Sequence, residues 1–151
     1  MDWTALTEAL AAKYEGLANA DASETLRASH ATTPDAPVAP CAVTVLAGLG
    51  DIAPEGPGWL TGFANVDVMI LLAPVPDVPR RYAAMLRWVG PATTAAMSGV
   101  MLGMTSSVAG AVPVDVEVAL AGDSEVYAGL PWDLVRVRYR IPYRDRVTVT
   151  P

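Results

Sequence analysis

A glycine-rich segment behind a short apolar run is the first candidate for chemistry in this 151-residue chain. Residues 48–53, Gly-Leu-Gly-Asp-Ile-Ala, fit the G-x-G-x-x-G/A pattern of dinucleotide-binding sites. In such a site the pattern opens a helix, and the amino end of that helix receives the pyrophosphate. Here Pro54, Gly56, Pro57 and Gly58 follow at once, so we expect no helix and no dinucleotide site.

The single histidine and the single cysteine are the next candidates, because a Cys/His pair can act as nucleophile and base. His30 lies among Ser, Ala and Thr residues, with no Cys, Asp or Glu at the spacing of metal ligands. Cys41 has no second cysteine with which to form a disulfide. We therefore expect a surface histidine and a buried cysteine. The sequence predicts no catalytic residue, no cofactor and no metal site, hence no enzyme.

Charged and apolar residues alternate in the last third of the chain. Val and Leu alternate with Asp115 and Glu117 over residues 114–120, and Val, Tyr and Ile alternate with arginines over residues 135–141. The arginines are Arg136, Arg138 and Arg140. A period of two predicts two half-buried strands. If these strands pair antiparallel and in register, the acids of one face the arginines of the other, which explains the arginine stripe without a nucleic acid.

The distribution of charge is uneven along the chain. The formal net charge is −6, which argues against a general nucleic-acid binder. Residues 1–77 carry ten acids against Lys13 and Arg27, whereas residues 78–151 carry eight arginines against six acids. A molecule with two unlike ends can stack on copies of itself or on neighbours. Contact with DNA is expected to be nonspecific at most.

Two segments have a clear helical period. Residues 2–18 place one aromatic and leucine stripe on a single face, with Asp2 or Thr4 as the expected cap. After Asp77, another candidate cap, residues 79–89 place four apolar side chains on one face. These are Tyr82, Met85, Leu86 and Val89. The Gly-Pro pair at residues 90 and 91 is expected to end this second helix.

A third helix is expected over residues 93–104, where Met97, Val100, Met101 and Met104 share one face and the other face is small and uncharged. The charge-free stretch around it, residues 88–114, is interrupted by Gly-Pro, Thr and Ser residues, so we expect no membrane span. The chain also begins without the basic and apolar regions of a secretory signal, and synthesis in a host cytoplasm is expected.

The elements predict an α+β fold with a mainly antiparallel sheet of about four strands and helices packed on one face. Besides the two C-terminal strands, residues 41–47 form a brief apolar run and residues 59–73 form a strand. The latter directs Val66, Val68 and Ile70 to one side. Loops are expected at 19–40 and 48–58, and residues 1–151 are expected to form a single domain.

This order of elements resembles the tail terminator proteins of long-tailed bacteriophages. The resemblance covers roughly residues 2–145. It includes the 59–73 strand, the short helix ending in Leu86 and Trp88, and the aromatic, glycine-bearing segment Glu125–Leu134 before the last strand. It implies a tail-terminator-like domain that works as a homo-oligomeric ring, usually a hexamer, at the head-proximal end of the tail. Such a ring ends polymerisation of the tail tube.

The resemblance further implies a structural protein of the virion tail or neck, with the tail tube protein and the head connector or neck protein as partners. We expect charged residues to form its interfaces: Asp51, Glu55, Arg80, Arg81, Arg136, Arg138 and Arg140. On this basis, replacing Arg80 and Arg81 by Glu should impair assembly and leave the monomer folded.

Two alternatives stay open from the sequence. A neck or head-completion adaptor protein shares the size and the ring symmetry of a terminator. From another class, a small ligand-binding α+β domain would place its pocket between the methionine-lined helix and the sheet.

Overall fold

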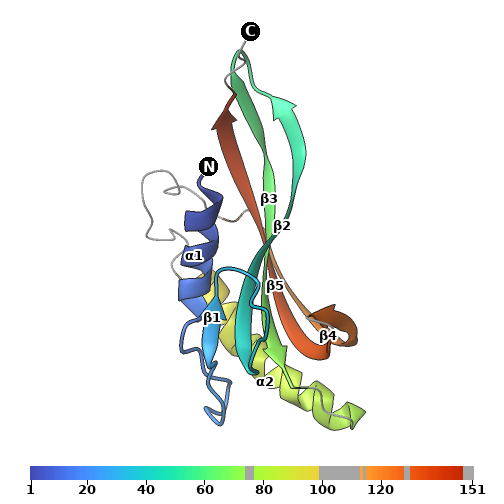
Figure 1. Cartoon of the computed structure of the whole chain (residues 1–151). Helices are drawn as coiled ribbons and strands as arrows, with labels where there is room; N and C mark the ends of the chain where they lie inside the picture. The colour runs from blue at the N-terminus through green and yellow to red at the C-terminus, as the bar shows by residue number, and fades with distance from the viewer. Residues whose placement is uncertain (74–76, 99–112, 114, 128–129, 148–151) are drawn as a thin grey trace.

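The computed structural model describes residues 1–73, 77–98, 113, 115–127 and 130–147. Its elements, in chain order, are α1 (Trp3–Tyr14), β1 (Ala28–His30), β2 (Cys41–Pro54), β3 (Trp59–Leu72), α2 (Val78–Met97), β4 (Asp115–Tyr127) and β5 (Leu130–Arg146). The fold is α+β, as predicted, and the strands form one mixed sheet in the order β1-β2-β3-β5-β4 (Figure 1).

We expected a mainly antiparallel sheet of about four strands, whereas the sheet has five strands and is mixed. The fifth strand, β1, lies within the segment that we expected to be a loop, 19–40, and it pairs parallel to β2. The other three pairings are antiparallel. Three residues suffice for this short edge strand, because the chain that leads into it packs at Leu26, which is buried.

Helix α1 begins where the sequence predicted. The side chain of Asp2 accepts a hydrogen bond from the Ala5 N–H at 3.0 Å, which satisfies one of the free donors of the first turn. Leu6, Leu10 and Tyr14 form the buried face of the helix. The helix ends at Tyr14 and not at residue 18, because Gly16 adopts the left-handed conformation, with φ of 67°.

Both helices cover the same face of the sheet. The core between them contains Leu6 and Leu10 of α1, Met85 and Trp88 of α2, and an apolar row from each of β3, β4 and β5. The predicted inward residues of β3 are confirmed there: Val66, Val68 and Ile70. The Tyr14 and Tyr139 hydroxyls lie 2.6 Å apart inside this core, so each buried hydroxyl has a partner.

Helix α2 runs through the Gly-Pro pair that was expected to end it. A proline inside a helix leaves the carbonyl four residues earlier without its donor, here the carbonyl of Arg87. The N–H of Ala20 supplies the missing bond to the Arg87 oxygen at 2.8 Å. A long-range contact thus offsets the local cost of Pro91. Of the third predicted helix, residues 93–98 belong to α2 or follow it, and the rest lies outside the described residues.

The second predicted loop, 48–58, was also wrong over most of its length. Strand β2 continues to Pro54, and only residues 55–58 form the turn into β3. The glycines lie at register shifts between β2 and β3, one at Leu46/Gly48 and one at Gly50/Ala53. Such bulges admit an extra residue without ending the strand, and glycine and Asp51, with φ of 52°, accommodate the local bend.

This long hairpin extends away from the two helices, together with the end of β5 (Figure 1). We call residues 50–63, with residues 140–146 of β5, the arm, and the rest of the sheet with its two helices the body. Every residue from Asp51 to Trp59 is exposed. Strand pairing through the arm is continuous, because β5 runs beside β3 from Leu72↔Asp133 to Trp59↔Arg146.

The two C-terminal strands pair as predicted. Strands β4 and β5 are antiparallel, and Asp115 lies opposite Arg140 and Glu117 opposite Arg138. Strand β5 begins at Leu130, earlier than the predicted start at residue 135. Neither helix is long and apolar enough to cross a membrane.

Candidate interaction surfaces

The face of the sheet away from the helices carries the arginine stripe, and Asp67 of β3 lies at its centre. Arg138 donates two hydrogen bonds to the Asp67 carboxylate, at 2.7 and 2.8 Å. Arg136 contacts the same carboxylate at 3.7 Å. The hydrogen bond to Asp67 is the main cause of the raised pKa of Arg138, and the charge of Glu117 adds to it. The predicted register with β4 is thus correct, but the carboxylate that binds these two arginines comes from β3.

Sequence reasoning missed Asp67 as a partner, although a signal was present. It is the one acid within the apolar strand β3, and it lies on the outward side of that strand. A carboxylate in that position needs a cation beside it when it is nearly buried, as here.

The arm repeats one arrangement twice along its length. In the first copy Arg140 lies over the Phe63 ring, 3.8 Å from its centroid, and contacts the Asp51 carboxylate at 2.7 Å. In the second, Arg144 lies over the Trp59 ring at 4.3 Å and contacts Glu55 at 2.8 Å. Each of these two arginines of β5 thus joins an acid, Asp51 of β2 or Glu55 of the turn that follows it, to an aromatic ring of β3.

The predicted interface residues that lie in the arm all take part in ion pairs. Asp51 meets Arg140 directly, and Glu55 meets Arg144, which the sequence analysis did not select. These groups are all substantially exposed, so the ion pairs add little to stability and remain reachable from solvent.

The two arginines at the start of α2 differ in their surroundings. Arg80 is exposed and contacts Asp77 at 3.5 Å. The Arg81 side chain is only 15% exposed, and its Nε contacts the nearly buried Asp133 carboxylate at 3.2 Å. Arg81→Glu would place a second carboxylate near Asp133, so the double replacement of Arg80 and Arg81 is expected to destabilise the monomer as well as to alter the surface. Of the two arginines, Arg80 is the exposed one, and its role as an interface residue stays a prediction.

Helix α2 carries exposed apolar side chains as well as buried ones. The sequence analysis grouped Tyr82 and Leu86 with Met85 on one face, but of the large side chains in α2 the buried ones are Met85 and Trp88. Val78, Tyr82 and Leu86 are spaced four apart and are 67%, 54% and 46% exposed. We call these three residues the α2 stripe. The helix has two apolar sides, and the sheet can cover only one of them.

The candidate Cys/His pair is not assembled. Cys41 is fully buried, as predicted, and burial raises the pKa of its thiol. His30 is partly buried in β1 and lies opposite Val43, two residues further along β2 than Cys41. The glycine pattern at residues 48–53 lies inside β2, with no helix after it.

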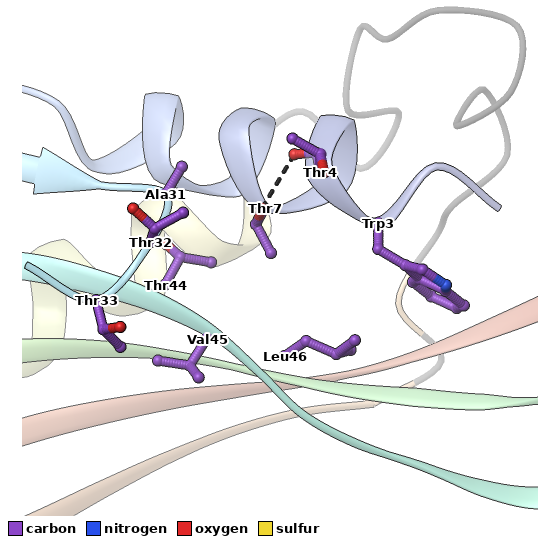
Figure 2. A pocket seen from close by; sticks show the side chains of 9 residues that line it. All are labelled: Trp3, Thr4, Thr7, Ala31, Thr32, Thr33, Thr44, Val45 and Leu46. Atoms are coloured by element: carbon purple, nitrogen blue, oxygen red, sulfur yellow. Dashed lines mark hydrogen bonds between the residues drawn. The ribbon is translucent and has the colours of Figure 1, made fainter.

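A pocket of about 290 Å³ lies between α1, the end of β1 and the edge of β2 (Figure 2). Its lining is uncharged and rich in threonine: Trp3, Thr4, Thr7, Ala31, Thr32, Thr33, Thr44, Val45 and Leu46. Figure 2 shows Ala31, Thr32 and Thr44 gathered at one end and Trp3 at the other. The Thr44 hydroxyl is buried and has no hydrogen-bond partner in the described part of the chain.

No protein-family model matches this chain, and no curated protein matches it either. Across the residues that the structure describes, no group of three His, Cys, Asp or Glu side chains is placed to hold a metal ion. The surfaces described above are therefore the features from which a function can be argued.

Proposed function

We propose that this chain is a structural subunit of a virion assembly, of the kind that phage tail terminators form. In this role it binds copies of itself in a ring at the head-proximal end of the tail and ends polymerisation of the tail tube. The resemblance in element order supports the specific form of the proposal. The arm is the observation that supports an assembly role in general.

In a monomer, an arm of this kind leaves apolar side chains exposed to water. Leu49, Ile52 and Trp59 on the arm or at its base are 42%, 55% and 36% exposed, and neither helix covers the tip. Exposed apolar residues on a projecting hairpin gain free energy when a neighbouring molecule covers them. The α2 stripe is a second such surface, at the other end of the molecule (Figure 1).

Two different surfaces on one subunit are what a closed ring requires. In a heterologous interface the contact patch of one subunit differs from the patch that it meets on the next. Contact of the arm of one subunit with the α2 region of another would satisfy this condition.

The test compares two exposed aliphatic positions. Ile52→Asp changes the arm, whereas Val38→Asp changes a residue that is 58% exposed outside it. The mass of the purified full chain is measured by light scattering, followed by negative-stain imaging with and without purified tail tubes. We expect a ring of about six copies, in solution or on tube ends, that is lost in Ile52→Asp and retained in Val38→Asp.

A chain that stays monomeric and leaves tube ends free would overturn the proposal. Equal behaviour of the two variants, with the ring intact, would remove the arm from the interface. A neck or head-completion adaptor would form a ring but bind isolated connectors in place of tube ends, so the same images separate these two roles.

A further inference from the structure

Exposed apolar side chains are concentrated in two parts of the molecule. Among the residues that the structure describes, nine large apolar side chains are exposed, and eight of them form two groups of four. The first group belongs to α2: Val78, Tyr82, Leu86 and Met97. The second group, which we call the arm group, lies on the arm or next to it: Leu49, Ile52, Trp59 and Val147. Single exposed apolar residues are ordinary on a protein surface, whereas two groups of this size indicate contact surfaces.

The apolar surface of α2 is longer than the α2 stripe. Gly90, Thr93 and Met97 are also exposed, and they continue the stripe at spacings of four, three and four residues. None of them is charged. We call the stripe and these three residues together the α2 face. At a rise of 1.5 Å per residue, this uncharged face is about 28 Å long.

Hydrogen bonds at the end of the arm hold part of the arm group together. The Glu55 N–H donates to the Trp59 carbonyl at 2.9 Å, and the Val147 N–H donates to the Gly58 carbonyl at 2.9 Å. Trp59 and Val147 therefore lie beside the same turn. Ile52 lies in the second bulge of β2, close to that turn in the sequence. The end of the arm thus presents apolar side chains from three chain segments.

The two groups together have enough area for a specific interface. A large apolar side chain has about 150–200 Å² of surface, so four that are roughly half exposed present roughly 300–400 Å². Contact between the groups would bury about 700 Å² of apolar surface, which corresponds to about 1,200 Å² in all, because apolar atoms make up about 60% of an interface. Specific protein interfaces begin at about this size.

A second copy of the chain supplies the partner that each group needs. The arm and α2 lie at opposite ends of the molecule (Figure 1), so the arm of one copy meets the α2 face of another. Contact between two α2 faces would leave both arm groups in water, and contact between two arms would leave both α2 faces there. Contact between an arm and an α2 face covers both groups in every copy once a ring closes.

We propose that the arm group of each copy docks on the α2 face of the next copy, over the length of the helix from Val78 to Met97. This inference rests on the ring proposed above and deepens it, since it names the two surfaces that meet. It also assigns a direction to the contact. Each copy gives one arm and receives one, so a copy that lacks either surface can still bind a single neighbour through the other.

Two variants, each defective in one surface, test this direction. Ile52→Asp alters the arm group and Leu86→Asp alters the α2 face, and both positions are exposed, so each monomer should fold, which circular dichroism checks. By light scattering we expect each variant alone to be monomeric. An equimolar mixture should form a dimer of one copy of each and nothing larger, because only one arm and one α2 face in that pair are intact. The control, Val38→Asp, should assemble like the parent chain.

A rescue within one chain tests whether the two positions meet. Ile52→Lys combined with Leu86→Asp places opposite charges on the two surfaces and should restore part of the assembly that each single change abolishes. Ile52→Asp combined with Leu86→Asp places like charges there and should not restore it. Equal behaviour of the two double variants would contradict contact between these positions.

Crosslinking separates this contact from the proposed function. A photoreactive amino acid at position 52 of the full chain should crosslink to residues 78–97 of another copy, which mass spectrometry of mixed light and heavy-isotope chains identifies. If these crosslinks form but tail tube ends stay free, the contact stands and the proposed function fails. If rings form on tube ends but the crosslinks lie elsewhere, the function stands and this inference is overturned.

Other occupants of the two surfaces give different results. Association of Ile52→Asp alone would show that two α2 faces pair, and association of Leu86→Asp alone would show that two arms pair. A mixture of the two that stays monomeric, or crosslinks confined to a single chain, would show that no second copy docks there. Each of these results overturns the inference.

Discussion

The body and the arm contain the same kinds of contact in different surroundings. The body has a fully buried tryptophan, Trp88, and an ion pair between Arg81 and Asp133 with little access to water. The arm has a tryptophan that is 36% exposed, Trp59, and ion pairs that lie in solvent. Burial therefore decides what each contact contributes, since water competes for the groups of the arm and is excluded from those of the body.

The contacts of the body and those of the arm therefore have different roles. The contacts of the body hold the sheet to its helices and determine stability. Those of the arm keep a three-stranded extension straight and leave its surface available for a neighbour. Removing equivalent side chains from the two regions should therefore give very different losses of stability.

The largest difference is expected between the two tryptophans. Trp88→Ala should lower the free energy of unfolding by about 3–5 kcal/mol, because it leaves a cavity between α2 and the sheet. Trp59→Ala should cost about 1 kcal/mol or less, mainly through its contact with Arg144. Urea unfolding followed by circular dichroism measures both. Similar losses would contradict the distinction between body and arm.

The next difference concerns two arginines. Arg81→Ala leaves the Asp133 carboxylate buried without this cation and should cost about 3 kcal/mol. Arg144→Ala breaks an exposed pair and should cost less than about 1 kcal/mol. Thermal melts of both variants test this. Adding Asp133→Asn to Arg81→Ala should recover part of the loss, and no recovery would show that packing alone explains it.

The tyrosine pair of the body should make stability depend on alkaline pH. Burial is the main cause that raises the pKa of Tyr139 to about 12, and it also raises the pKa of Tyr14. The unfolded chain releases these protons near pH 10, so the stability that this pair contributes is complete below about pH 10 and is lost as the pH rises to about 12. The expected loss from Tyr139 is about 2–3 kcal/mol.

Denaturant midpoints measured across that pH window test this loss. The double variant Tyr14→Phe with Tyr139→Phe should lack it, and Tyr82→Phe, on the exposed side of α2, should retain it. A parent chain whose midpoint stays level from pH 10 to about 12 would contradict the buried pair as its cause.

The sequence by itself determined the local patterns. Alternation of apolar and charged residues predicted the pairing of β4 with β5 and the inward side of β3, because a strand turns successive side chains to opposite faces. Asp2 predicted the start of α1, because capping depends only on neighbouring backbone groups. Seven interface residues could be selected by charge, although their role as interface residues remains a prediction.

Only the tertiary structure decided the features that depend on distant partners. Pro91 does not end α2, because Ala20, remote in sequence, supplies a donor to the Arg87 carbonyl. Asp67 binds the arginines of β5, because β3 lies beside that strand in the sheet. The pocket beside Thr44 lies where β1 ends and β2 continues. The residue pattern of one segment does not determine which other segment packs against it. Contacts between distant residues therefore form only when the strands and helices come together.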